Sequence, residues 1–186
     1  MQSENKIFHF EFVLKKLLEW YEVSNAGKKE NDLSVLKALK LLFFVAASNS
    51  EKDSSELLEN VFDNFVAMPY GHVESDVYTK IRNTQGSLNF YVINNVKTNI
   101  KADVNISELE NKIDSKYKIE IESAVNTLKR INPNLINLSA FELVDLSHAW
   151  YSWKMYHVPY RRGISSQKIP TDVIKKEDKI FSLQMM

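Results

Sequence analysis

The sequence of 186 residues contains no cysteine, which excludes disulfide bonds and any metal or nucleophilic site that needs a thiolate. It has only four glycines, and these lie far apart, so there is no glycine-rich loop of the kind that holds phosphate groups. A chain without cysteine suits the reducing cytosol, and no secretory signal is visible at its start. We therefore expect a cytoplasmic protein.

Neither sign of charge predominates, because 24 Lys and Arg residues balance 24 Asp and Glu residues. A protein dedicated to nucleic acid usually has an excess of basic residues, so nucleic acid is not the expected partner. The charge is uneven along the chain. Residues 51–76 include seven acidic residues and one basic residue, whereas residues 154–186 include seven basic and three acidic residues. Such asymmetry can guide a protein partner.

Long hydrophobic runs are also missing: the longest fully apolar run, at residues 41–47, is too short to span a bilayer. Hydrophobic residues nevertheless make up 44% of the chain, which is enough for a sizeable core. The length suits one globular domain. We expect a single compact domain over residues 1–186 that is mainly α-helical and does not enter a membrane.

Apolar residues recur at three- and four-residue steps in several segments, which predicts amphipathic helices. The first such segment is 7–21. The second, 33–48, follows Asp32, which we expect to cap it, and its second half (41–47) is apolar on all sides. A helix of that kind belongs at the centre of the domain. Further helices are predicted at 56–65, 114–131 and after Pro170.

Two serines indicate helix starts in the last third of the chain. Ser139 and Glu142 form the pattern of a capping box, which predicts a short helix. Ser147 is expected to cap the helix that follows it, so that His148 would lie in its first turn. We expect the His148 side chain to be partly buried and hydrogen-bonded there.

Alternating residues between 88 and 102 predict one small β-hairpin, with a two-residue turn at Asn94 and Asn95. A helix that uses every fourth residue from Leu88 to Ile100 is the alternative. The β-branched residues and asparagines of this segment disfavour a helix, so the hairpin is the better prediction.

The segment 65–78 predicts a turn that leads into a helix. Pro69 suits the second position of a β-turn and Gly71 the fourth. Glu74 or Ser75 can start the helix, with acidic groups at its N-terminal end. We expect Gly71 to be required for its backbone conformation, with a positive φ.

Histidines and one aspartate raise the possibility of a metal enzyme. Asp145 and His148 are three residues apart and would share a helix face, and His72 and His157 are further candidate ligands. A metal-dependent hydrolase built on Asp145, His148 and His157 is therefore an alternative function. The simpler interpretation, which we prefer, is that His148 makes a hydrogen bond where two helices meet.

Aromatic and basic residues gather between positions 150 and 162. Trp150 and Trp153 could stack on bases while Arg161 and Arg162 hold phosphates, as in a regulator that binds its own promoter. Aromatic residues at helical spacing more often face a core, and this is the preferred interpretation. Exposed members of the cluster would suit a protein interface, where Trp, Tyr and Arg are favoured.

Three stretches of this sequence resemble those of one known family. Residues 36–46, Leu-Lys-Ala-Leu-Lys-Leu-Leu-Phe-Phe-Val-Ala, are similar to its Lys-Leu-Leu-Tyr-Phe-Ala helix. Residues 69–78, Pro-Tyr-Gly-His-Val-Glu-Ser-Asp-Val-Tyr, are similar to its Tyr-Gly-Pro-Val…Val-Tyr signature. Residues 142–148, Glu-Leu-Val-Asp-Leu-Ser-His, with Trp150 or Trp153 after them, are similar to its Ser/Thr-His…Trp segment. In order and spacing they resemble the Panacea antitoxin domain, the SocA-like family of phage-associated proteins.

The resemblance extends over about residues 7–181, with a departure at His72, where the family usually has proline. It implies a helical antitoxin that neutralises a co-encoded toxin by direct binding, without enzymatic activity, cofactor or metal. One branch of the family delivers its toxin to a AAA+ protease, and this adaptor role is the alternative. The residues that the resemblance and the exposed cluster mark for partner binding or for the motif are Tyr70, Gly71, Tyr78, His148, Trp150, Trp153, Arg161 and Arg162.

Overall fold

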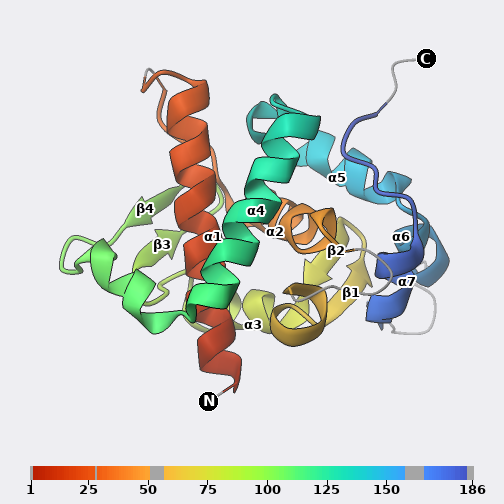
Figure 1. Ribbon diagram of the computed structural model, residues 1–186, viewed down its shortest axis with the longest axis horizontal. Helices are drawn as coiled ribbons and strands as arrows, with labels where there is room; N and C mark the ends of the chain where they lie inside the picture. The colour runs from red at the N-terminus through yellow and green to blue at the C-terminus, as the bar shows by residue number, and fades with distance from the viewer. Residues whose placement is uncertain (1, 28, 51–56, 158–165, 184–186) are drawn as a thin grey trace.

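The computed structural model shows a mainly α-helical protein with small antiparallel sheets (Figure 1). It describes residues 2–27, 29–50, 57–157 and 166–183. The α-helices are α1 (Gln2–Ser24), α2 (Val35–Ser48), α3 (Ser75–Asn83), α4 (Ser115–Ile131), α5 (Ala140–Ala149), α6 (Tyr151–Tyr156) and α7 (Thr171–Lys176). Shorter turns are the π-helical η1 (Leu57–Val61) and the 3-10 turns η2 (Ile106–Lys112) and η3 (Leu135–Asn137). The strands are β1 (Phe65–Met68), β2 (Gly71–Glu74), β3 (Tyr91–Ile93), β4 (Thr98–Ile100) and β5 (Gln167–Lys168).

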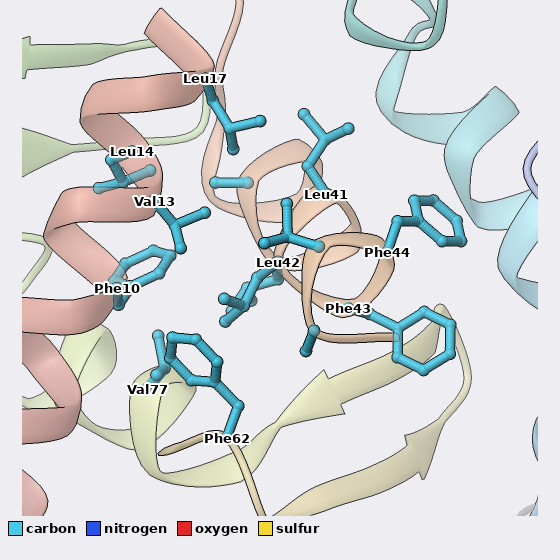
Figure 2. Close-up of a cluster of buried hydrophobic side chains, with 14 of the residues drawn as sticks. Phe10, Val13, Leu14, Leu17, Leu41, Leu42, Phe43, Phe44, Phe62 and Val77 are labelled. Carbon is cyan, nitrogen blue, oxygen red and sulfur yellow. The ribbon is translucent and has the colours of Figure 1, made fainter. Parts of the chain in front are cut away.

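Helix α2 lies at the centre of the protein, as its all-round apolarity predicts. It contacts α1, α4, α5 and β2, and every residue of 41–47 is at most 2% exposed. Figure 2 shows Leu42 facing the apolar side of α1, whereas Phe43 and Phe44 point to the opposite side of α2. A helix whose whole circumference is apolar can be stable only when other elements cover it on all sides.

The turn at Pro69 joins two strands. Strands β1 and β2 pair with Met68 opposite Gly71, so Pro69 and Tyr70 form the loop of a hairpin. Gly71 has a φ of +94°, which confirms the predicted positive φ. Helix α3 begins at Ser75, as predicted, and Glu74 caps it by accepting a hydrogen bond from the Val77 amide at 2.9 Å.

Within the described part (57–65) of the helix predicted at 56–65, only η1 is helical, and the last residue, Phe65, begins strand β1. The apolar residues of β1 alternate between buried and half-buried positions, which is a strand pattern that four residues are too few to reveal. Strand β5 adds to the free edge of β1 and was also not predicted.

The hairpin predicted at 88–102 is confirmed as β3 and β4, which pair with Ile93 opposite Thr98. Its connection has four residues, so the predicted two-residue turn is wrong. The Asn94 side chain explains the longer loop, because its oxygen accepts hydrogen bonds from the amides of Val96 and Lys97 at 2.8 and 2.9 Å.

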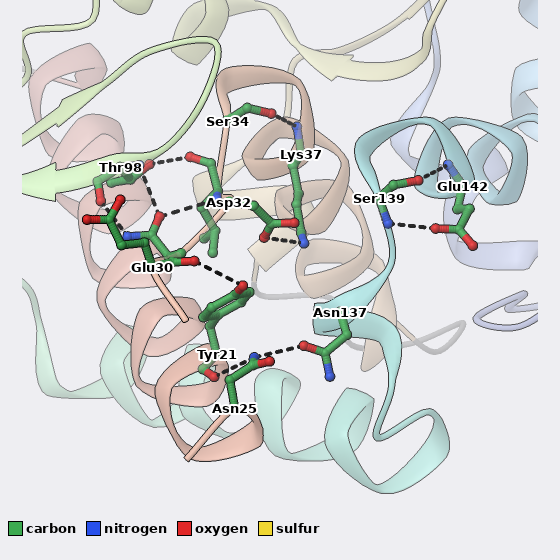
Figure 3. A network of polar contacts seen from close by, with 12 residues as sticks. Tyr21, Asn25, Glu30, Asp32, Ser34, Lys37, Thr98, Asn137, Ser139 and Glu142 are labelled. Carbon is green, nitrogen blue, oxygen red and sulfur yellow. Dashed lines mark hydrogen bonds and ion pairs between the residues drawn. The ribbon is translucent and has the colours of Figure 1, made fainter. Parts of the chain in front are cut away.

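The polar network of Figure 3 shows how the helix starts are capped. Ser34 caps α2 by accepting a hydrogen bond from the Lys37 amide, so the cap predicted at Asp32 is wrong. Asp32 instead pairs with the Lys37 ammonium group at 2.6 Å. The capping box of Ser139 and Glu142 is confirmed, with both of its reciprocal hydrogen bonds present.

The C-terminal third differs from the prediction at Ser147. This residue lies inside α5, which ends at Ala149, and the side chain does not cap α6. His148 is consequently in the last turn of α5, not in the first turn of the next helix. Pro170 precedes α7 as predicted, and α7 ends at Lys176. Among the described residues, no helix combines the length and the apolar character that crossing a membrane requires.

Candidate functional site

A buried polar junction joins the β1–β2 hairpin to α5 and α6. Its centre is the His72 imidazole, which is fully buried. Nδ1 lies 2.8 Å from the Ser147 hydroxyl oxygen, and Nε2 lies 2.7 Å from the Ser152 hydroxyl oxygen. The His72 backbone amide also donates to the Ser147 oxygen at 3.1 Å. Both ring nitrogens therefore have partners, and two helices are tied to one residue of β2.

The surroundings of His72 keep its ring uncharged. The ring stacks on Phe43 with 3.7 Å between centroids, and Trp150 meets it edge-on. Burial lowers the pKa of His72 well below its ordinary value, and the nearby Lys40 and His148 lower it further. A neutral imidazole donates through one nitrogen and accepts through the other, which the two serine hydroxyls can satisfy.

Lys40 is the second unusual group of the junction. Its ammonium nitrogen is fully buried and donates to the His72 carbonyl oxygen. Within the part of the chain that the structure describes, no carboxylate forms an ion pair with it. Burial lowers the pKa of Lys40 to about 7, because the low-polarity surroundings disfavour the charged form.

The Lys40 pKa predicts a pH dependence of stability. Between pH 7 and its ordinary pKa of 10.5, the unfolded chain carries a proton on this lysine that the folded protein releases. The free energy of unfolding should therefore rise with pH across this window, by at most about 1.4 kcal/mol per pH unit. In Lys40→Met this contribution should disappear. Urea denaturation of both proteins at several pH values measures the difference, and parallel curves would contradict the assignment.

Gly71 lies at a close approach between the hairpin and α5. A Cβ atom at this position would lie 2.8 Å from the Ser147 Cβ and 3.2 Å from the Lys40 nitrogen. The backbone at +94° is also one that residues with a side chain rarely adopt. Glycine is therefore needed for space as well as for conformation.

His148 links the tip of the hairpin to α5 and α6. Its Nε2 lies 3.1 Å from the Pro69 carbonyl oxygen, and its ring stacks on Trp153 at 3.7 Å. Trp153 in turn donates to the Met68 carbonyl oxygen at 2.9 Å. The expectation of a half-buried, hydrogen-bonded His148 is confirmed. Burial lowers the pKa of His148, although the hydrogen bond to the Pro69 carbonyl oxygen acts to raise it.

The geometry does not favour the alternative of a metal-dependent hydrolase. His148 and His157 both stack on the Trp153 indole, and His148 directs Nε2 to a carbonyl oxygen. The ligand atoms of Asp145, His148 and His157 do not lie close enough together to hold a metal ion. Among the described residues, one group has such an arrangement, and it consists of Asp63, Glu74 and Asp76.

Exposed and half-buried aromatic side chains lie next to residues of the buried junction in the chain. We define the aromatic surface as Tyr70, Phe141, His148 and Trp153. Tyr70, at the hairpin tip, is 58% exposed, and its ring meets that of Phe141 edge-on at 6.4 Å. Phe141 is 65% exposed and lies seven residues before His148 on α5, so both occupy one face of that helix. Large aromatic side chains on a rigid hairpin and helix are typical of protein interfaces.

The other residues predicted for the site do not belong to the aromatic surface. Trp150 is fully buried and donates its indole N–H to the Ile180 carbonyl oxygen at 2.8 Å. Tyr78 lies away from the junction on α3, where the Arg82 guanidinium covers its ring. Arg161 and Arg162 lie outside the described residues. A binding role for any of these residues stays a prediction.

Three residues of the site were not predicted: Lys40, Ser152 and Phe141. A lysine within the most apolar helix is a detectable signal, although helix periodicity alone does not tell whether it is buried. Ser152 has no such signal, because the residue that its hydroxyl contacts, His72, lies 80 positions away in the chain. Phe141 lies between Ser139 and Glu142 of the capping box, and the sequence pattern does not tell whether its ring is exposed or buried.

Comparisons with known proteins give one match. A family model described as antitoxin SocA-like, Panacea domain, matches residues 39–154, which is more than half of the chain. Neither the curated proteins nor the solved structures contain a match. The matched range includes Lys40, the β1–β2 hairpin and all four residues of the aromatic surface.

Proposed function

We propose that this chain, which belongs to the family of SocA-like antitoxins with a Panacea domain, is a cytoplasmic antitoxin that neutralises a toxin protein by binding it directly. The observation that supports this most is that the family match and the aromatic surface coincide: the residues that build the buried junction and the exposed rings all lie within 39–154. Neutralisation of this kind needs a complementary surface and no catalytic group.

The aromatic surface has the properties of a binding site that is formed before its partner arrives. Tyr70 is held at the tip of a two-residue loop, and His148 and Trp153 are fixed by hydrogen bonds to the Pro69 and Met68 carbonyl oxygens. Side chains that are already ordered lose little conformational entropy on binding. The exposed rings of Tyr70 and Phe141 provide the apolar area that a partner would bury.

The proposal is tested with the genes that flank this one. Each neighbouring open reading frame is expressed alone and together with this chain, and colony counts are compared. We expect one neighbour to be toxic alone and harmless in the presence of the chain, and the two proteins to co-purify. Neighbours that are all harmless, or a toxic one that the chain neither rescues nor binds, would contradict the proposal.

The same experiment distinguishes direct neutralisation from the protease-adaptor role. If binding alone neutralises the toxin, its half-life in the cell should be unchanged or longer when the chain is present. A toxin that disappears faster with the chain, and does so only in cells with an intact AAA+ protease, would favour the adaptor.

Phe141→Ala should weaken toxin binding at least tenfold, because removal of a central interface ring typically costs about 2 kcal/mol or more. The matched control is Ile119→Ala on α4, which removes an equally exposed apolar side chain outside the aromatic surface, at 65% exposure in both cases. Isothermal titration calorimetry with the purified toxin gives both affinities. Equal affinities of the two variants would place the toxin elsewhere on the protein.

A further inference from the structure

A pocket of about 510 Å³ is lined by residues from the N-terminal part of α1, the start of α3 and the start of α4. It shares no residue with the aromatic surface, and the proposed function does not use it. Its lining combines the side chains of Lys6, His9, Asp63, Asp76 and Tyr117.

The first feature of the pocket is an excess of carboxylates. The Lys6 ammonium group contacts Asp63 at 2.8 Å, Glu74 at 2.7 Å and Asp76 at 2.6 Å. One cation is thus shared by three anions. Glu74 is fully buried, whereas Asp63 and Asp76 are about half exposed and keep part of their carboxylates open to the pocket. Burial opposes the charge on Lys6, but the three carboxylates outweigh this and raise its pKa, so Lys6 stays charged.

The second, independent feature is a buried acceptor without a partner. His9 is only 8% exposed, and its Nδ1 lies 2.6 Å from the Asn5 carbonyl oxygen. A carbonyl oxygen can only accept, so Nδ1 carries the proton. Burial lowers the pKa of His9 and keeps the ring neutral, which leaves a lone pair on Nε2. Within the described residues Nε2 has no hydrogen-bond partner, although buried polar atoms almost always have one.

We propose that this pocket binds a guanidinium group. Both Asp76 oxygens already accept a hydrogen bond, one from Lys6 and one from Asn64. The groups with spare acceptor capacity are the Asp63 carboxylate, which is bonded to Lys6 through one oxygen, and His9 Nε2. A ligand here must therefore supply positive charge and N–H donors. A guanidinium offers five N–H donors in one plane, which can reach His9 and a carboxylate together. The Tyr117 and His9 rings are nearly perpendicular, with 5.0 Å between their centroids, and Tyr117 supplies an aromatic wall that attracts cations. His9 Nε2 is closed off from solvent, so a guanidinium group has to displace a neighbouring side chain to reach it.

A divalent metal ion fits this pocket less well. Its ligands would be the same three carboxylates, and Lys6 already lies among them at hydrogen-bond distance from each. A metal would have to displace that ammonium group, whereas a guanidinium can bind beside it. The pocket is also much larger than a single ion, which suits an arginine side chain or a small guanidinium compound.

The inference is tested on the full chain by NMR titration with two probes. Nα-acetyl-L-arginine amide represents an arginine within a partner protein, and agmatine represents a free guanidinium compound. The matched control ligand is Nα-acetyl-L-citrulline amide, which has the same shape without the charge. We expect saturable shifts at the His9 and Tyr117 signals with the first probe, with agmatine, or with both, and none with the citrulline compound. Whichever probe binds more tightly identifies the source of the group.

Two variants examine the groups of the pocket separately. Asp63→Asn and His9→Phe should each weaken binding of the tighter probe about tenfold, since each removes one acceptor. Asp103→Asn, an equal charge change at an exposed position outside the pocket, should leave the affinity unchanged. The inference is overturned if neither probe binds at millimolar concentration, if citrulline binds equally, if neither pocket variant weakens binding, or if only Ca²⁺ or Mn²⁺ produces the shifts. Each of these outcomes is independent of whether the chain neutralises a toxin.

Discussion

Gly71→Ala should lower the free energy of unfolding by about 2–6 kcal/mol. Two effects act together at this position. Alanine at a φ of +94° is strained by about 1–3 kcal/mol. Its Cβ would also approach the Ser147 Cβ to 2.8 Å, and overpacking of a well-filled interior typically costs about 1–3 kcal/mol. Urea denaturation, with the midpoint and slope compared with those of the wild-type protein, measures the loss.

Gly27→Ala is the matched control for this prediction. Gly27 also has a positive φ, of +65°, but an added Cβ would meet no atom within 4 Å. Its substitution should therefore cost only the backbone strain, about 1 kcal/mol. A similar loss of unfolding free energy in both variants would show that the close approach of the hairpin to Ser147 adds nothing to the cost of a side chain at Gly71. A neutral Gly71→Ala would contradict the described geometry of the turn.

Phe43→Ala should destabilise the protein by about 3–5 kcal/mol, the range for removing a fully buried aromatic ring. Phe43 is 0% exposed, and its ring contacts those of Phe65, His72 and Trp150 with centroid distances of 5.4, 3.7 and 4.7 Å. Its removal leaves a cavity where α2, the hairpin and the C-terminal helices meet, and it takes away the surface on which His72 stacks.

The control for Phe43→Ala removes the same side chain from the surface. Phe141→Ala should change the free energy of unfolding by no more than about 0.5 kcal/mol, because that ring is 65% exposed. Thermal and urea denaturation of both variants give the comparison. If Phe43→Ala lowered the free energy of unfolding by less than Phe141→Ala does, the central position of α2 in the core would be refuted.

Several features of this protein follow from short-range patterns in its sequence. The apolar run at 41–47 predicts the central helix, and Pro69 with Gly71 predicts the turn, because each depends on residues that are neighbours in the chain. The β3–β4 hairpin and the capping box at Ser139 are predictable for the same reason. The family that three short stretches resemble is likewise confirmed, by the match over residues 39–154.

The two predicted helix caps that proved wrong, Asp32 and Ser147, are side chains that can either cap a helix or bind another group. Asp32 and Ser34 are both good helix caps, and only the position of the Lys37 ammonium group assigns Asp32 to an ion pair and Ser34 to the cap. Ser147 is a plausible cap for the next helix, but in the folded protein its hydroxyl contacts the His72 ring and backbone amide. The sequence offers both roles, and packing selects one.

The sequence by itself determined the mainly helical fold, the central helix, the turn at Gly71 and the family. Only the tertiary structure decided that His72 and Lys40 are buried together where the β1–β2 hairpin meets α2, α5 and α6. The residues that form these hydrogen bonds are far apart in the chain. Lys40 and His72 are separated by 32 residues, His72 and Ser147 by 75, and His72 and Ser152 by 80. Burial and hydrogen bonding at such separations leave no periodic trace in a sequence, because they depend on how whole elements pack and not on the order of neighbouring residues.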